Sequence, residues 1–311
     1  MSDLLAKQAQ ADKSVVLQHI SALPSLVVNS RRDALPEDYV RVTLVDTETT
    51  GVSDTDRVIE LAMQSVYLDK KQGYGIVQVE HAWIQMQDPG RPIPPEASAV
   101  NGIFDADVAG RFIDWVHVKE TLDGSDVVMA FNAGFDRRML ERELEKVPDP
   151  DRADGFLELD TSPETGPVWA CPLAQLKWQG VPARSQEVLC AFVAGFWYDG
   201  HRADADILAL LYLLSRTGRF EELLTRAYAP DVVVRIAGAF AAKDAIKARG
   251  YQFDGTNKVW WRTLSSVPAE LEVELEWAHR ECFPSMGRDL MLTRSVRLDP
   301  TRPQIRFSRY S

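Results

Sequence analysis

The segment VRVTLVDTE at 40–48 constrains the fold of this chain more than any other feature. Its β-branched and apolar residues predict a strand, which ends in two carboxylates, Asp46 and Glu48. Because strand side chains alternate between faces, both carboxylates point to one side, while Val45 and Thr47 point to the other. Two adjacent carboxylates repel each other unless a cation lies between them, so the pair suits oxygen-ligated Mg²⁺ or Mn²⁺. By itself, such a pair at a strand end is more often a solvated edge than a metal site.

A third acidic residue, Asp136, falls in the segment AFNAGFD at 130–136. An apolar strand runs into Asn132, and Asp136 then lies in the first turn of a predicted helix. The helix dipole alone favours an acid at this position, so Asp136 has a purely structural explanation as well as a functional one.

A fourth acidic residue, Asp206, lies at the start of a strongly periodic predicted helix, ADADILALLYLL at 203–214. The apolar positions of this helix place Asp206 near its buried face, and Asp204 is the competing acid. His201 precedes Asp206 by five residues, on the loop. A loop histidine and a helix-borne aspartate can share one cavity as base and metal ligand, although a loop histidine is more often a surface residue.

The order of the predicted elements indicates an α/β domain with a mixed sheet, followed by a smaller α+β module. In the first part, strands are predicted at 40–48, 58–68, 75–85 and 126–131, and helices at 134–147, 185–195 and 203–214. After residue 230 the pattern restarts with a strand, a helix, the strand KVWWRTL, the helix PAELEVELEWAHREC and a closing strand, PQIRFSRY at 303–310. We therefore expect an N-terminal arm and linker at 1–38, a main domain at 39–228 and a module at 229–311.

Residues 1–23 predict one or two amphipathic helical segments, which would pack on the main domain or on a second subunit, so a homodimer is possible. The module contains the segment KDAIKARGYQFDGTNKVWWRTL at 243–264, which includes a basic, aromatic strand. Its residues Trp260 and Trp261 lie on opposite faces of the predicted strand. They either fill the core and an interface, or stack on exposed bases.

The charge of the chain is uneven. The net charge is −11, but the residues from 231 onward hold 13 Lys and Arg against 10 Asp and Glu. This acidic balance argues against tight, sequence-specific duplex binding but not against an enzyme that grips a chain end. Three widely spaced cysteines without a CxxC motif, no signal-like N-terminus and no membrane-length apolar run predict a cytoplasmic protein without a membrane partner.

Taken together, three motifs resemble the DEDDh branch of the DEDD exonuclease superfamily, the group of ribonuclease T, exonuclease X and polymerase III epsilon subunits. They are DTETTG at 46–51, NAGFD at 132–136 and HRADAD at 201–206, in the family's order and spacing. The resemblance covers about residues 40–216 and implies a ribonuclease H-like fold with a central mixed sheet flanked by helices.

The resemblance implies that Asp46, Glu48, Asp136 and Asp206 hold two Mg²⁺ or Mn²⁺ ions, with Asp204 as a bystander. Asp46 would bridge both ions, Glu48 and Asp206 would complete one site, and Asp136 would hold the other. His201 would be the general base. The substrate-binding residues expected around them are Thr49, Thr50, Gly51, Asn132, Asn101, Trp260 and Trp261. At Asn101 many relatives have a histidine, so the chain departs from the family there.

The implied activity is metal-dependent 3′→5′ hydrolysis of DNA, at single-stranded or frayed ends, with release of nucleoside 5′-monophosphates. Such an enzyme would act in DNA repair, in proofreading or on phage or foreign DNA. Two alternatives remain open at this point: a 3′→5′ exoribonuclease of the same fold, and a non-catalytic adaptor that binds nucleic acid.

Overall fold

The computed structural model describes residues 18–19, 35, 37–265 and 267–308. Contacts divide these residues into two compact units. The larger unit runs to Leu224 and also includes Phe307 and Ser308, and the smaller unit spans Thr225–Arg306. The smaller unit therefore begins at Thr225 instead of 229 and ends at Arg306 instead of 311.

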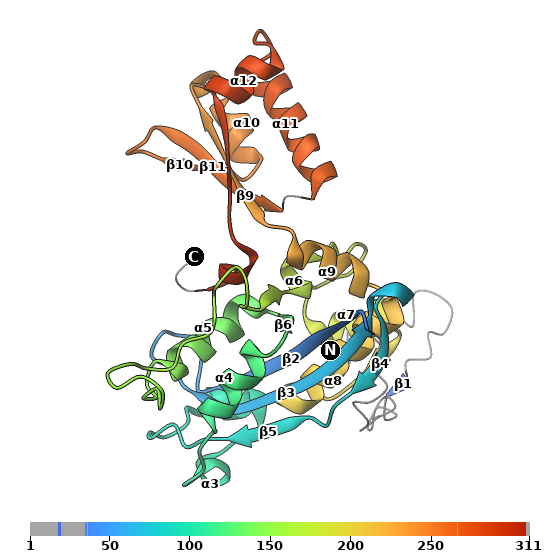
Figure 1. Ribbon diagram of the computed structural model, residues 1–311, viewed down its shortest axis with the longest axis vertical. Helices are drawn as coiled ribbons and strands as arrows, with labels where there is room; N and C mark the ends of the chain where they lie inside the picture. The colour runs from blue at the N-terminus through green and yellow to red at the C-terminus, as the bar shows by residue number, and fades with distance from the viewer. Residues whose placement is uncertain (1–17, 20–34, 36, 266, 309–311) are drawn as a thin grey trace. The chain divides into compact units, whose positions relative to one another are not determined.

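A six-stranded mixed sheet forms the centre of the larger unit (Figure 1). Its order is β4-β3-β2-β6-β7, and β5 also pairs with β3. Pairing is antiparallel around β3 and parallel from β2 through β6 to β7. The strands are β2 (Tyr39–Thr49), β3 (Val58–Asp69), β4 (Gly75–Val79), β5 (Trp83–Met86), β6 (Val127–Met129) and β7 (Val168–Ala170).

Helices pack on both faces of this sheet. On one face, Val45 of β2 joins a cluster with residues of α4 (Trp115–Asp123) and α5 (Ala133–Leu144). Since strand side chains alternate, Leu44 and Asp46 point to the opposite face, where α8 (Ala203–Thr217) packs against β2 and β3. The fold thus confirms the α/β class with a central mixed sheet flanked by helices.

Shorter helices complete the larger unit, and the sequence analysis did not predict most of them. Three lie between β5 and β6, where no helix was predicted, and their short apolar stretches carry little periodic signal. The helices not yet named are α2 (Pro95–Asn101), α3 (Asp105–Val108), α6 (Pro172–Gln175), α7 (Gln186–Val193) and α9 (Phe220–Tyr228), with the 3₁₀ helix η2 (Lys70–Gln72).

Two predictions for the larger unit need correction. The segment 75–85 is two strands, β4 and β5, because each pairs with a different stretch of β3, and Glu80 between them donates its backbone N–H to Ser65. The helix predicted for 1–23 is wrong at Gln18–His19, which form strand β1, parallel to β8 (Phe196–Trp197). The edge of β8 supplies a pairing partner that local periodicity cannot reveal. The rest of 1–23 lies outside the described residues.

The smaller unit is a four-stranded antiparallel sheet, in the order β10-β11-β9-β12, with helices on one face. Alternate residues of the strands, Val234, Ile236 and Trp260, share one core with Ile246, Met291 and other helix residues. The elements are β9 (Asp231–Ala237), α10 (Lys243–Ala248), β10 (Gln252–Asp254), β11 (Val259–Ser265), α11 (Pro268–Cys282), α12 (Arg288–Arg294) and β12 (Val296–Pro300), with 3₁₀ helices η3 (Phe240–Ala242) and η4 (Pro303–Ile305).

The closing strand predicted at 303–310 is wrong over 303–308, and residues 309 and 310 lie outside the described residues. Pro303 starts η4, and the last strand of the smaller unit is β12. Pro303 has no N–H for a ladder, and Arg306 is buried, with hydrogen bonds from its guanidinium to the carbonyls of Ala227 and Ala229 and an ion pair to Asp231. Arg306 therefore donates hydrogen bonds to carbonyl groups at the end of α9 and does not extend the sheet.

Candidate active site

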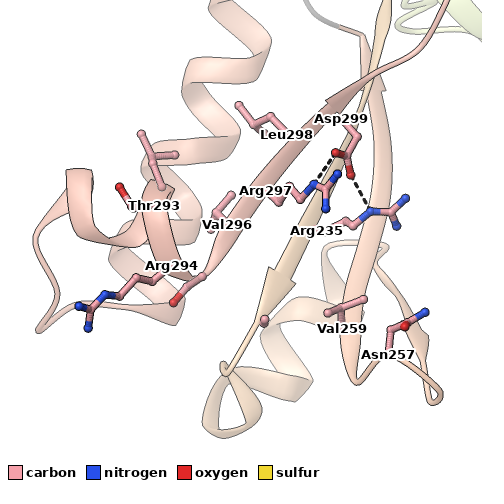
Figure 2. A pocket seen from close by; sticks show the side chains of 12 residues that line it. Arg235, Asn257, Val259, Thr293, Arg294, Val296, Arg297, Leu298 and Asp299 are labelled. Carbon is pink, nitrogen blue, oxygen red and sulfur yellow. Dashed lines mark hydrogen bonds and ion pairs between the residues drawn. The ribbon is translucent and has the colours of Figure 1, made fainter.

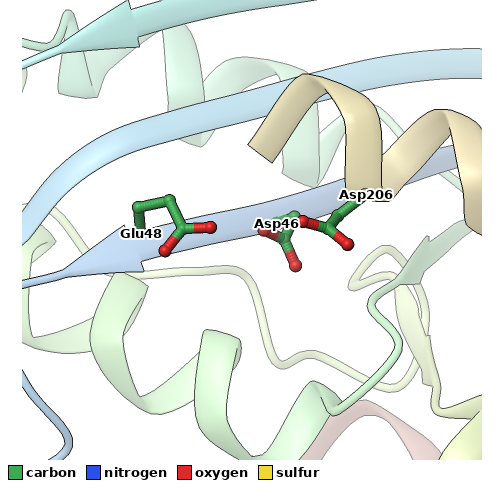
Figure 3. Close-up of side chains that lie close together, drawn as sticks. All are labelled: Asp46, Glu48 and Asp206. Carbon is green, nitrogen blue, oxygen red and sulfur yellow. The ribbon is translucent and has the colours of Figure 1, made fainter. Parts of the chain in front are cut away.

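Three of the predicted carboxylates meet where β2 ends. Asp46 and Glu48 of β2 and Asp206 of α8 offer oxygens that all lie within 4.8 Å of one another (Figure 3). The alternation of the strand brings the first two to the same face, and α8 packs on that face and supplies the third. Oxygen ligands at this spacing are the donor set of a hard divalent cation.

Asp136 is held beside this group. It is 3% exposed and accepts hydrogen bonds from the backbone N–H of Thr47, at 3.1 Å, and from the Thr47 hydroxyl, at 2.9 Å. Among the residues that the structure describes, the group within 4.8 Å is Asp46, Glu48 and Asp206, so Asp136 lies outside it. Its charge nevertheless acts on Asp46, because a neighbouring carboxylate raises the pKa of that buried acid.

The electrostatics of the site favour protonation unless a cation is bound. Burial, together with the neighbouring carboxylates, raises the pKa of Asp46 well above its ordinary value and that of Glu48 to about 8. Burial also raises the pKa of Asp136 to about 7, against the hydrogen bonds from Thr47, and raises the pKa of Asp206. A divalent cation would remove this conflict, because it replaces the protons as the positive charge.

His201 lies at the rim of the site on strained backbone. Its φ is 67°, in the left-handed region that a non-glycine residue adopts at a cost, and its side chain is 55% exposed. The backbone N–H groups of His201 and Arg202 both donate to Asp206 Oδ2, at 2.8 and 3.2 Å. The His201 ring lies 3.6 Å from Glu187, measured from Nε2 to Oε1. The loop thus presents an accessible imidazole directly beside a metal-ligand candidate.

Tyr198 and Gln186 hold Asp206 in place by hydrogen bonds, and the sequence analysis did not predict either residue. The Tyr198 hydroxyl donates to Asp206 Oδ1 at 2.5 Å, and the Gln186 amide donates to the Tyr198 oxygen at 2.9 Å and to the Asp206 carbonyl at 2.7 Å. Burial and the Asp206 carboxylate raise the pKa of Tyr198, so the phenol stays protonated and keeps donating.

Replacing Tyr198 with phenylalanine is expected to weaken binding of Mn²⁺ to the site about tenfold, because a hydrogen bond to a charged group contributes about 1.5–3 kcal/mol. Asp206 would lose one of the contacts that orient it. Calorimetric titration of the protein with Mn²⁺ measures this. Tyr212→Phe makes the same chemical change in the same apolar cluster and serves as the control; an equal effect of both variants would contradict a role through Asp206.

An ion pair between a buried carboxylate and a half-exposed arginine fixes the start of α8. Glu60 of β3 is fully buried and lies opposite Glu48 in the strand register. It accepts from the Arg202 guanidinium at 2.6 and 3.1 Å and from the Ala203 backbone N–H at 3.0 Å. Glu60 therefore connects α8, the helix that carries Asp206, to β3, the strand that pairs with β2 and its Asp46. It sits in an apolar stretch of sequence with no motif to mark it.

The predicted substrate contacts Thr49, Thr50 and Gly51 are engaged within the protein. The Thr49 hydroxyl donates to the Gly51 carbonyl at 2.6 Å, and the buried Thr50 hydroxyl donates to Asp56 at 2.8 Å. A Cβ on Gly51 would come within 2.6 Å of the Asp56 carboxylate, so this position needs glycine. The segment is thus a fixed turn beside Glu48, and its backbone is engaged as well, because the Thr50 N–H donates to the Arg57 carbonyl at 2.9 Å.

The other predicted contacts differ in their accessibility. Asn132 is exposed at the start of α5, whereas Asn101 is buried and bonds to the Thr49 carbonyl, at 3.4 Å, and to Glu48.

Trp260 is 6% exposed and lies in the core of the smaller unit, so the core interpretation holds for this residue. Trp261 is partly exposed. Asp204, the expected bystander, is exposed and lies outside the metal-ligand group.

Comparison with known proteins agrees with this geometry. A family model described as exonuclease (RNase_T) matches residues 43–214, which include the carboxylates, His201 and Tyr198. No curated protein matches the chain. Within the described residues, helices long and apolar enough to span a bilayer are absent.

Solved structures of exonucleases are similar to parts of the chain. Exonuclease X in complex with 5′ overhanging duplex DNA is 26% identical, with a TM-score of 0.36, over 58% of this chain and 96% of that one. The zinc-bound complex of E. coli exonuclease I with single-stranded DNA is 14% identical, with a TM-score of 0.46, over 85% of this chain and 64% of that one. The match thus spans less than two thirds of exonuclease I.

Proposed function

The chain belongs to the RNase_T family of exonucleases, whose model matches more than half of it, and on this basis we propose that it is a metal-dependent 3′→5′ exonuclease acting on DNA. The proposal rests chiefly on one observation: three carboxylates, Asp46, Glu48 and Asp206, converge within 4.8 Å. The half-exposed His201 lies next to them. A cation site beside an accessible base is the arrangement that phosphodiester hydrolysis needs.

The four carboxylates would hold two ions, Mg²⁺ or Mn²⁺. Asp46, Glu48 and Asp206 would form one ligand group, and Asp136 would serve the second ion. Bound ions supply a water of lowered pKa and neutralise charge on the phosphate and on the leaving oxygen. The carboxylate set fits such ions, because its oxygens are hard donors and because burial, together with the neighbouring carboxylates, raises the pKa values of these acids.

The side chains of the site perform the remaining steps. His201 accepts the proton of the attacking water, and Glu187, 3.6 Å from its ring, stabilises the resulting imidazolium. Water adds to phosphorus and the bond from phosphorus to the 3′-oxygen breaks. The shortened strand keeps its 3′-oxygen, which takes up a proton, and a nucleoside 5′-monophosphate leaves. The exposed Asn132 and the turn at Thr49–Gly51 hold the terminal nucleotide.

Matched 5′-labelled single strands of DNA and RNA test this function, with Mg²⁺, Mn²⁺ or EDTA. We expect a ladder that shortens from the 3′ end, only with metal, and faster on DNA. A 3′-labelled strand should release labelled mononucleotide at once. Faster cleavage of RNA would make the chain an exoribonuclease. A pure protein that binds strands but gives no ladder with either metal would instead be a binding adaptor.

A further inference from the structure

The sheet of the smaller unit has one face that its helices leave uncovered. Val234, Ile236 and Trp260 point into the core with α10, α11 and α12. Their neighbours on each strand therefore point the other way. The residues on this second face, which we call the open face, are all partly or fully exposed: Asp231, Val233, Arg235 and Ala237 on β9, Gln252 and Asp254 on β10, Val259, Trp261 and Thr263 on β11, and Arg297 and Asp299 on β12.

One row across the open face combines an aromatic ring with two arginines. The strand register pairs Trp261 with Arg235, and Arg235 with Arg297. Side chains at paired positions lie on the same face, with Cβ atoms about 4.5–5.5 Å apart. A cavity of about 1030 Å³ lies alongside this row, and its lining includes Arg235, Arg297, Arg294 and Asn257 (Figure 2). The Trp261 ring thus lies next, in the strand register, to Arg235, which is one of the cationic side chains that line this hollow.

The charge of this face is positive. Asp299 is paired with both Arg235, at 2.7 Å, and Arg297, at 2.6 Å, through the Nε atom of each (Figure 2). Asp299 serves two guanidiniums, each of which has five N–H donors, and Asp254 on β10 is a second carboxylate near Arg235. The exposed Arg294 adds a third cation, and Asp231 is paired with Arg306, so three arginines remain against two carboxylates. The unit Thr225–Arg306 holds 13 Lys and Arg against 10 Asp and Glu, a net of +3, whereas the whole chain carries −11.

We propose that the open face binds a single strand of nucleic acid, with a base stacked on Trp261 and phosphates on Arg235, Arg297 and Arg294. This inference builds on the proposed function, which gives the chain a polymeric anion as its substrate. Aromatic rings that stack bases and cations that follow the phosphates are the two components of sequence-tolerant single-strand binding. Trp260 contributes to the core of the unit and not to this face, so the two neighbouring tryptophans have different tasks.

Binding of a labelled single DNA strand to the full chain in EDTA tests the proposal, because no hydrolysis occurs without metal. Arg297→Glu should weaken binding about tenfold at low salt and reduce the salt dependence by about one to two phosphate contacts. Arg280→Glu is the matched control. Arg280 is 70% exposed and ion-paired to Glu281, much as Arg297 is 78% exposed and paired to Asp299, but it lies on α11, on the helical side of the sheet. It should change affinity less than about twofold.

A second pair of variants tests the stacking. Trp261→Ala should weaken strand binding about 5- to 100-fold, and Trp261→Phe should recover most of the loss, because phenylalanine keeps a ring on which a base can stack. Equal affinities of the Arg297→Glu and Arg280→Glu proteins would overturn the proposal. The proposal would also be overturned if polyglutamate bound to the protein as tightly as the DNA strand does. A change of oligomeric state in the variants that accounts for their loss of strand affinity would overturn it too.

The outcome is independent of catalysis. A protein that gives no ladder but binds strands through Arg297 and Trp261 would refute the proposed function and leave the open face as a binding surface. A metal-dependent ladder combined with unchanged binding in all of these variants would refute the open face and leave the exonuclease intact.

Discussion

Replacing Asp46 with asparagine is expected to abolish hydrolysis, with kcat at least about 1000-fold lower, in a protein that remains folded. Asp46 lies among Glu48, Asp136 and Asp206, and each of these carboxylates raises its pKa. The proposed metal site would therefore lose the carboxylate that lies among the other three. A 1000-fold loss corresponds to about 4 kcal/mol of transition-state stabilisation, within the range that metal ions supply.

The control for this change is Asp204→Asn. Asp204 is exposed on the same helix as Asp206 and bonds only to the local backbone N–H of Ala205 among its described contacts. It should retain near-parent activity under the same labelled-strand assay. Asparagine at position 46 also removes repulsion, so the melting temperature of the metal-free protein should stay the same or rise. An Asp46→Asn protein with near-normal turnover would sink the assignment of the site.

The metal-free protein is expected to lose stability as the pH rises from about 5 to about 8.5. Burial raises the pKa of Glu48 to about 8 and that of Asp136 to about 7 in the folded state, from ordinary values near 4. Groups with raised folded pKa values stabilise the fold fully below their unfolded pKa, and this contribution disappears as the pH passes the folded pKa. A pKa that differs by one between the folded and unfolded states corresponds to about 1.4 kcal/mol, so the loss amounts to several kcal/mol.

Calorimetric unfolding in EDTA and in Mn²⁺ across this pH range measures the effect. Metal should stabilise the protein most at the upper end of the range, because protons no longer compete for the carboxylates there. The double variant Asp46→Asn, Glu48→Gln lacks two of the four carboxylates of the site, so its stability should depend less on pH. A metal-free profile that rises with pH between 6 and 8 would contradict the raised pKa values of these acids.

The sequence was sufficient to predict the parts of the site that local patterns encode. Strand alternation predicted that Asp46 and Glu48 share a face, and helix periodicity favoured Asp206 over Asp204. Both features follow from residues a few positions apart, where backbone geometry alone decides which way a side chain points. The strand predicted at 303–310 shows the limit of local patterns. Pro303 and the buried Arg306 determine the structure of this segment, and the sequence pattern does not reveal the partners of Arg306.

The residues that position the site could not be predicted, because their partners are set by tertiary packing. Tyr198 is eight residues from Asp206 and lies before a loop, and Glu60 is 142 residues from Arg202. In the sequence, Glu60 looks like one acid within an otherwise apolar strand. Only the pairing of β3 with β2 and the packing of α8 on this sheet make it the anchor of the helix that carries Asp206.

The return of the chain to the larger unit after Arg306 determines how the smaller unit can be removed genetically. Phe307 packs against the same cluster as Val45 and Trp169, and Ser308 is buried. The smaller unit is therefore an insert with two junctions, and a stop codon at 225 would also delete part of the hydrophobic core around the nuclease. An informative deletion would excise 225–306 internally and splice a flexible linker before Phe307. A frameshift within the insert would change the sequence of the smaller unit and would also remove Phe307 and Ser308 from the larger one.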